Sequence, residues 1–293
     1  MTGTSSVFKS ISLRKILSVA RGVPVIPIII LLTFVIVGVF GSFIMPHDPT
    51  DADFEYTLTP PFWQKGGTTK YLLGTDHLGR DVLSRLISGT RISLQVGFIV
   101  VALAGMLGSV IALLSGYLGG WIDMVLMRLT DTVMSLPYLM VAIVLAAVLG
   151  PSKNNIIIIL AIVGWAGYAR VLRGEVLRIK ESDFVHLAVT SGCSKTRIMV
   201  VHLFPNIVNT LVVLATLQLG IVIIAESSLS FLGVGVPPPD PAWGLMIAEG
   251  RNYISNGWWL CLWPGLSILL VVLSCNLVGD WLRVRLDPKF RQI

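Results

Sequence analysis

Charged residues are scarce in this chain, and their scarcity excludes most soluble proteins. Aspartate, glutamate, lysine and arginine together make up 13% of the 293 residues, about half of their usual share in a soluble domain. Hydrophobic residues make up 54%, and the mean hydropathy is +0.82. The sequence therefore predicts an all-α integral membrane protein, because a helix satisfies its own backbone hydrogen bonds inside a bilayer.

Cysteine is rare as well, with three residues in all. Cys261 and Cys275 fall about four helical turns apart on one predicted span, too far to bridge each other, and Cys193 lies in a loop. We therefore expect no disulfide. The chain has no CxxC and no paired Cys/His spacing, so no pattern indicates a metal site.

Nucleotide-binding motifs are also missing. Ser194 precedes Lys195 where a phosphate-binding loop requires glycine. Residues 233–235 read Gly-Val-Gly but lack the third glycine and the helix start of a dinucleotide-binding turn. No Ser/His/Asp or metal-like cluster falls at membrane depth, which disfavours a membrane-bound enzyme. We expect the chain to be no enzyme and to bind no cofactor itself.

Six apolar runs are long enough to cross a bilayer as helices. They cover residues 23–45, 92–117, 133–150, 155–172, 206–229 and 257–280. The first run is no signal peptide, because its apolar core is too long and Pro46 follows it in place of a small-residue cleavage site. We divide the chain into residues 1–91, which hold the tail, the first span and an external loop, and residues 92–293, a five-span core.

Basic residues predict the orientation of the spans, because they accumulate on the cytoplasmic side. They cluster before the first span, between the fourth and fifth, and after the sixth: Lys9, Arg14, Lys15 and Arg21; Arg170, Arg173, Arg178, Lys180, Lys195 and Arg197; Arg283, Arg285, Lys289 and Arg291. The loop after the first span is acidic instead. We expect both termini in the cytoplasm, and we explain the net charge of +6 by topology and contact with anionic lipid rather than by nucleic-acid binding.

The cytoplasmic segment 180–205, called the elbow below, has the pattern of two short helices joined by a turn. Four apolar or small residues recur at i, i+3, i+4 and i+7, on one helical face: Phe184, Leu187, Ala188 and Ser191. Gly192 can end this helix in the left-handed conformation, Ser194 can cap the next, and Pro205 suits the first turn of the following span. An exposed apolar face predicts a docking surface, with a helix lying on the membrane surface as the alternative.

Charged residues within or beside the predicted spans are costly and need partners. Arg128 and Asp131 are three positions apart, so we expect a local structural ion pair, with a substrate site as the alternative. Glu226 has no opposite charge at helical spacing. We expect it either to line or gate a wet pathway or to cap local backbone.

Two external segments are long for loops. The last part of residues 73–86 predicts a short amphipathic helix at the outer interface. Four prolines between residues 237 and 241 stiffen the second segment. Long ordered loops on a rigid scaffold are usually functional, so we expect them to dock a soluble external protein. The candidate docking residues are Asp76, Arg80, Asp81, Pro238 and Trp243.

Three motifs carry a resemblance to a known family. They are LLGTDHLGRDVLSRLISGTRISLQVG at 72–97, the elbow, and ESSLSFLGVGVPPPDPAWG at 226–244. The whole chain resembles the inner-membrane permease subunits of ATP-binding-cassette importers, which have the type I architecture. Among these it is similar to the C-type permease of dipeptide and oligopeptide uptake systems.

The resemblance implies that the elbow couples the permease to an ATPase. The residues it assigns to this coupling are Phe184, Val185, His186, Leu187, Ala188, Gly192, Leu203 and Pro205. The family pattern has Glu-Ala-Ala where this chain has residues 186–188, so His186 replaces an acidic residue. Gly192, Leu203 and Pro205 match the pattern.

The resemblance also implies the partners and the location. A second homologous permease would complete the pathway, two ATPases would hold ATP and Mg, and an external solute-binding protein would deliver cargo across a bacterial or archaeal plasma membrane. Peptides, nickel chelates and sugars remain open as cargo. The alternative is a proton-coupled secondary transporter with Glu226 or Asp131 as carrier, which is disfavoured because the sequence shows no inverted repeat.

Overall fold

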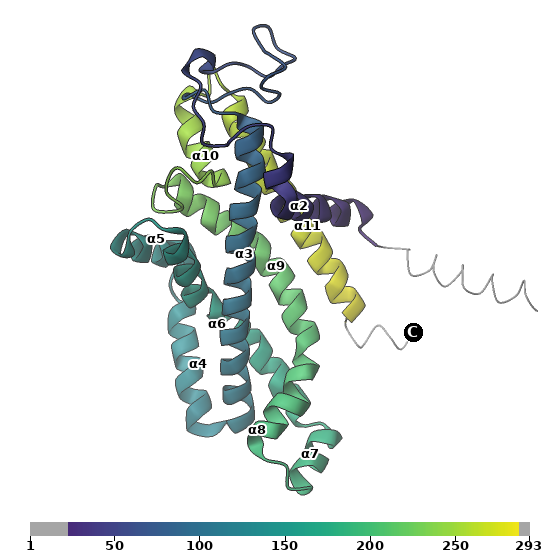
Figure 1. The fold of residues 1–293 in the computed structure, drawn as a ribbon. Helices are drawn as coiled ribbons and strands as arrows, with labels where there is room; N and C mark the ends of the chain where they lie inside the picture. The colour runs from purple at the N-terminus through teal and green to yellow at the C-terminus, as the bar shows by residue number, and fades with distance from the viewer. Residues whose placement is uncertain (1–22, 287–293) are drawn as a thin grey trace, which may run out of the picture.

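Long helices account for most of the chain because its apolar runs carry few helix-breaking residues. The computed structural model describes residues 23–286; it is elongated, and helices joined by loops make up most of it (Figure 1). The basic residues before the first predicted span, together with Lys289 and Arg291, lie outside the described residues.

Five helices in the described part are long and apolar enough to cross a membrane. They are α2 (Val25–Ile44), α3 (Val82–Leu113, continued by a π-helix at Leu114–Leu118), α6 (Lys153–Lys180), the continuous run of α8 (Lys195–Arg197), a π-helix (Ile198–Leu203) and α9 (Phe204–Phe231), and α11 (Trp259–Leu286). A bent pair, α4 (Gly120–Met134) and α5 (Tyr138–Leu149), supplies a sixth span if the two count as one. Each predicted span corresponds to one of these elements.

The third predicted span, residues 133–150, is sharply bent. A proline in this span can bend its helix, and the chain turns by 85° between α4 and α5. Pro137 lies at this break as the N-cap of α5. Its ring removes a backbone donor and disfavours helical geometry in the residue before it, so the helix ends and restarts in a new direction.

The second span begins ten residues earlier than predicted, and no separate interfacial helix precedes it. Asp81 is the N-cap of α3, and its Oδ2 accepts hydrogen bonds from Ser84 N at 2.9 Å and Ser84 Oγ at 2.6 Å. The amphipathic stretch 81–86 is therefore the first turn of α3. Since α3 passes through residue 91 without a break, the proposed division between residues 91 and 92 falls inside a helix.

Helix α3 forms the centre of the bundle and packs against α2, α6 and α9, while α9 also packs against α11. Gly108 lets α3 approach α6 closely, because a Cβ atom there would lie 2.5 Å from Cβ of Tyr168 and 2.8 Å from the carbonyl oxygen of Trp165. Such contacts through small residues are how membrane helices gain packing energy.

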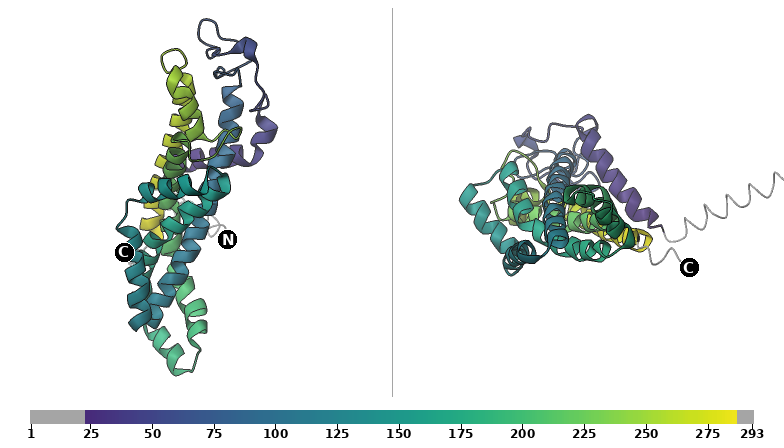
Figure 2. Two further views of the ribbon diagram at one scale, coloured as in Figure 1. Left: turned by 90° about the vertical axis from the view of Figure 1, so that its left-hand side faces the viewer. Right: turned by 90° about the horizontal axis from the view of Figure 1, so that it is seen from below.

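The two candidate functional regions lie at opposite ends of the molecule. The loop before α3 gathers with α10 (Trp243–Gly250) at one end, and α7 (Asp183–Thr190) and α8 form the other (Figures 1 and 2). A change at one end can reach the other only through the helices between them.

Candidate functional site

The elbow has the backbone geometry that its sequence predicts. Gly192 adopts φ +75°, the left-handed conformation that ends α7, and Cys193 N donates to the carbonyl oxygen of Ala188 at 3.1 Å. Ser194 caps α8, since its Oγ accepts from Arg197 N at 3.3 Å. Pro205 lies in the first turn of α9. The first helix and the turn are confirmed, but the second helix is no separate short element, because it continues from Lys195 through the π-helix into α9.

The faces of α7 are arranged differently from the prediction. Val185 and Ala188 are buried in a core cluster with Ile198 and Leu203, so they attach the elbow to its own bundle. Ala188 therefore does not share an outward face with Phe184, as the i, i+4 spacing had suggested. The sequence pattern could not show which side of an eight-residue helix meets the bundle.

The outward face of α7 is apolar. Phe184 is 43% exposed and Leu187 66% exposed, and Val189 and His186 are exposed beside them. The predicted coupling residues thus fall into an inner set, Val185, Ala188 and Leu203, and a set open to a partner. An apolar patch on a rigidly held short helix is suited to insert into a groove of another protein.

The predicted ion pair between Arg128 and Asp131 is wrong. Asp131 pairs with Arg170 on α6 instead, and no acidic group lies within ion-pair distance of Arg128 among residues 23–286. Helix α4 packs along α6, which brings a longer-range partner to Asp131. A second pair joins the same helices, because Arg173 Nε and Nη2 donate to the two carboxylate oxygens of Asp123 at 2.6 and 2.5 Å.

Glu226 is fully buried between α9 and α3. Hydroxyl groups of Ser93, Ser227 and Ser230 donate to its carboxylate at 3.2, 3.4 and 2.8 Å. The Ser230 hydroxyl also accepts from Val236 N at 3.1 Å. Glu226 therefore supports the backbone after α9 through one intervening hydroxyl.

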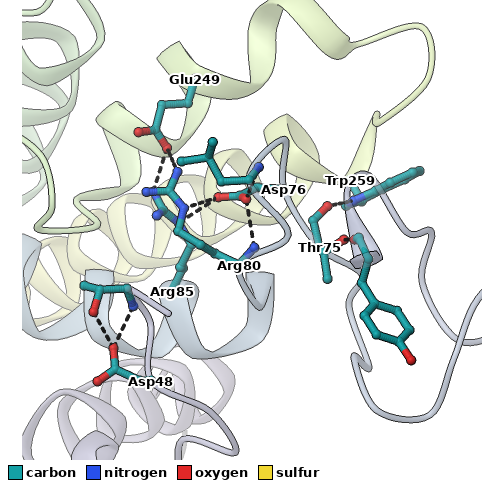
Figure 3. Close-up of polar contacts among 10 residues, drawn as sticks. Asp48, Thr75, Asp76, Arg80, Arg85, Glu249 and Trp259 are labelled. Carbon is teal, nitrogen blue, oxygen red and sulfur yellow. Dashed lines mark hydrogen bonds and ion pairs between the residues drawn. The ribbon is translucent and has the colours of Figure 1, made fainter. Parts of the chain in front are cut away.

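An outer ion cluster of Asp76, Arg80, Arg85 and Glu249 joins three parts of the chain (Figure 3). Arg80 Nε lies 2.7 Å from Asp76 Oδ2, and Arg80 Nη2 lies 3.0 Å from Glu249 Oε2. Arg85 Nη2 lies 2.6 Å from the same Glu249 oxygen, and Arg85 Nε lies 3.6 Å from Asp76 Oδ2. Two cations thus balance two anions, which is the condition under which buried charges are tolerated.

The cluster holds the loop before α3 and α10 against the start of α3. Asp76 Oδ1 also accepts from Leu78 N at 2.9 Å and Arg80 N at 3.0 Å, which fixes the loop around the carboxylate. On the other side of the loop, Trp259 Nε1 donates to the carbonyl oxygen of Thr75 at 3.0 Å (Figure 3). The first residue of α11 is thereby tied to the same loop.

Four of the five residues predicted to dock an external protein are buried. Asp76, Arg80, Asp81 and Trp243 are each less than a tenth exposed, and Pro238 alone of the five lies on the surface. Asp76 and Arg80 belong to the outer ion cluster, Asp81 caps α3, and Trp243 Nε1 donates to the carbonyl oxygen of Leu86 at 3.3 Å. These residues form the interior of the platform made by the loop before α3 and α10, rather than its surface.

Sequence reasoning missed Arg85 and Glu249, although both belong to the outer ion cluster. They are 164 positions apart, so no local spacing relates them. The available signal was the cost of burying an arginine in the first turns of an apolar helix, which requires an acidic partner.

A second, more exposed set of polar contacts, centred on Asp53, orders another part of the loop before α3. Lys70 Nζ donates to Asp53 Oδ2 at 2.9 Å, and the Tyr71 hydroxyl donates to the same oxygen at 3.0 Å. The Lys70 ammonium is the main reason that the pKa of Asp53 is lower than usual. Phe54, Phe62 and Trp63 remain about half or more exposed on this loop.

The sequence matches a known protein family. The family described as "Binding-protein-dependent transport system inner membrane component" matches residues 104–292. This region contains the elbow, Glu226 and Glu249, while Asp76, Arg80 and Arg85 precede it.

Curated relatives are similar over nearly the whole chain. The di/tripeptide transport system permease protein of Pseudomonas aeruginosa is 41% identical over 264 residues, 90% of this chain and 87% of that protein. The dipeptide transport system permease protein of Haemophilus influenzae is 39% identical over 267 residues, 91% of this chain and 90% of that protein. The glutathione transport system permease protein of Pectobacterium atrosepticum is 35% identical over 279 residues, 95% of this chain and 89% of that protein.

Proposed function

Because this chain belongs to the family of binding-protein-dependent transport system inner membrane components, we propose that it carries di- or oligopeptides across the plasma membrane as the C-type permease of an importer. The chain is the multi-pass permease subunit of an ATP-binding-cassette system, and ATP is hydrolysed on separate subunits. Such a system includes an ATPase and a binding protein. The peptide cargo is supported by relatives named for di/tripeptides and dipeptides.

The exposed face of α7 is the observation that supports the coupling role of the elbow. Phe184 and Leu187 point away from the bundle while Val185 and Ala188 hold the helix to it. When a partner that binds Phe184 and Leu187 moves, it therefore moves the bundle as well. We assign this binding of the elbow to one of two ATPases. The second ATPase would bind the corresponding segment of a homologous permease that completes the pathway.

The proposed orientation places both termini and the elbow in the cytoplasm and the platform around the outer ion cluster outside. The clustering of basic residues near the elbow supports it. An external solute-binding protein would then meet the surface that includes Pro238 and the exposed aromatic residues of the loop. In this arrangement the elbow transmits movement of the ATPase to the bundle at one end. The platform receives cargo from the binding protein at the other end.

The structure lends no support to the proton-coupled alternative. Asp131 is paired with Arg170, and Glu226 is enclosed by three hydroxyl groups. A proton carrier needs access to water on each side in turn, and Glu226 has no exposed surface.

Reconstitution tests the proposed function. Vesicles that hold this chain with the second permease, both ATPases and a peptide-loaded binding protein should take up radiolabelled alanyl-phenylalanine when ATP is supplied. Vesicles that hold the chain alone should take up none, with ATP or with a proton gradient. Uptake by the chain alone under a proton gradient would contradict the proposal.

A further inference from the structure

A chamber of about 360 Å³ lies at the break between α4 and α5. Its walls come from α3, α6, α9 and the two bent helices, and they include Ala104, Leu136, Tyr138, Gly164, Tyr168 and Gln218. Val100 and Ala104 contribute from the middle of the apolar span Val82–Leu118. The chamber therefore lies at membrane depth, and its volume falls in the range of small-molecule binding sites, about 300 to 1,000 Å³.

Two hydrogen-bonding groups in this chamber have no partner. Tyr168 is 2% exposed, and its hydroxyl forms no hydrogen bond with any residue that the structure describes. The side-chain amide of Gln218, which is partly buried, also forms none within residues 23–286. Burial of the Tyr168 hydroxyl without a partner is costly, and lipid tails cannot supply one. The cost indicates that the partner is a ligand of the chamber.

The Tyr168 hydroxyl and the Gln218 side-chain amide favour a ligand that can form hydrogen bonds with them. An acyl chain offers neither donor nor acceptor, so it would leave Tyr168 and Gln218 unsatisfied. A peptide backbone offers both in each amide group, and it matches a hydroxyl and a carboxamide that can each donate and accept. The remaining walls are mainly apolar, which suits the side chains of a short peptide.

The broken helix adds a preference for negative charge. Leu136 and Tyr138 flank Pro137, the N-cap of α5, and both line the chamber. No side chain caps this helix end, so its first backbone N–H groups keep their partial positive charge. Broken membrane helices use such N-termini to bind the carboxylates of substrates.

We propose that this chamber contacts the peptide during transport. The Tyr168 hydroxyl and the Gln218 amide bind its backbone, and the N-terminus of α5 faces its C-terminal carboxylate. This inference rests on the proposed function, and it assigns part of the cargo selectivity to the permease rather than to the binding protein alone.

A comparison of two cargoes tests these contacts in the assembled importer. Uptake of alanyl-phenylalanine and of its amide N-methylated analogue is measured per ATP hydrolysed, with both delivered by saturating loaded binding protein. We expect N-methylation to lower wild-type uptake about two- to tenfold, the range for one lost hydrogen bond. The double variant Tyr168→Phe and Gln218→Leu should lose this discrimination, whereas Thr216→Val, a hydroxyl on α9 outside the chamber, should keep it. Full discrimination by the double variant would overturn the inference.

A photo-crosslink identifies the occupant without removing either polar group. Benzoylphenylalanine at Ile221, which lines the chamber, should form an adduct with radiolabelled alanyl-phenylalanine during ATP turnover, and benzoylphenylalanine at Thr216 should not. An adduct with phospholipid or the second permease alone, in an importer that still transports, would overturn this inference and leave the proposed function standing. Failure of the wild-type importer to transport any peptide would instead overturn the proposed function.

Discussion

Arg85 Nη2 lies 2.6 Å from Glu249 Oε2, so one ion pair joins the first turns of α3 to α10 across 164 positions of sequence. Arg85 is 1% exposed, so bulk water does not solvate its charge in place of the carboxylate. The external platform therefore depends on this pair and on the neighbouring Arg80 and Asp76.

We expect Glu249→Gln to destabilise the external platform. The substitution leaves Arg85 and Arg80 with one fewer negative charge, and removal of one partner from a buried pair costs about 3 to 5 kcal/mol. The Tm of the purified protein in detergent should fall clearly. Lys70→Met is the control, because it breaks the exposed pair with Asp53, and exposed pairs contribute about 0 to 1 kcal/mol. Equal shifts for the two variants would refute the structural role of the cluster.

We expect Phe184→Asp to weaken ATPase docking by at least about tenfold. Roughly half of the phenyl surface remains to be buried by a partner, which contributes about 1 kcal/mol, and an unpaired carboxylate in the interface adds about 1 to 3 kcal/mol. Retention of the ATPases on the purified complex measures the effect.

Val185→Asp provides the matched comparison on the same helix. Val185 is buried against the bundle, so its replacement should unfold or detach the elbow and lower the Tm, whereas Phe184→Asp should leave the Tm unchanged. Normal ATPase retention and uptake with Phe184→Asp would remove the elbow from the coupling mechanism.

Gly192→Val should preserve assembly but impair transport. No atom lies within 4 Å of the position that a Cβ would take, so the only cost is backbone strain at φ +75°, about 1 to 2 kcal/mol. A shifted φ angle changes the orientation of α7 relative to α8. ATP-dependent uptake should fall while ATPase retention stays near wild type, and Gly192→Asn, which tolerates this conformation better, should retain more activity. Equal uptake by the valine variant would show that the turn does not need this geometry.

Single-cysteine labelling tests the proposed orientation. In a variant with Cys193, Cys261 and Cys275 replaced, an impermeant thiol reagent applied to intact cells should label Pro238→Cys and Glu55→Cys but not Lys195→Cys. All three positions are exposed on the described surface. Permeabilised cells provide the control, because all three variants should then react. Labelling of Lys195→Cys in intact cells would reverse the orientation.

Local signals in the sequence predicted the elements and their ends. Apolar runs located all the spanning segments, and Gly192 and Ser194 predicted the end of α7 and the start of the helix that follows it. These signals are reliable because each depends on the backbone conformation of one residue or on contacts within one or two helical turns. The same sequence motifs indicated the family.

Only the tertiary structure decided which distant residues meet. Asp131 pairs with Arg170 rather than with Arg128, and Ala188 faces the bundle rather than a partner. Helix packing brings together residues 39 and 164 positions apart in the ion pairs of Asp131 and Arg85, and the spacing along one helix contains no information about such pairs. The chamber likewise brings Tyr168 and Gln218, 50 positions apart, together beside the bend between α4 and α5.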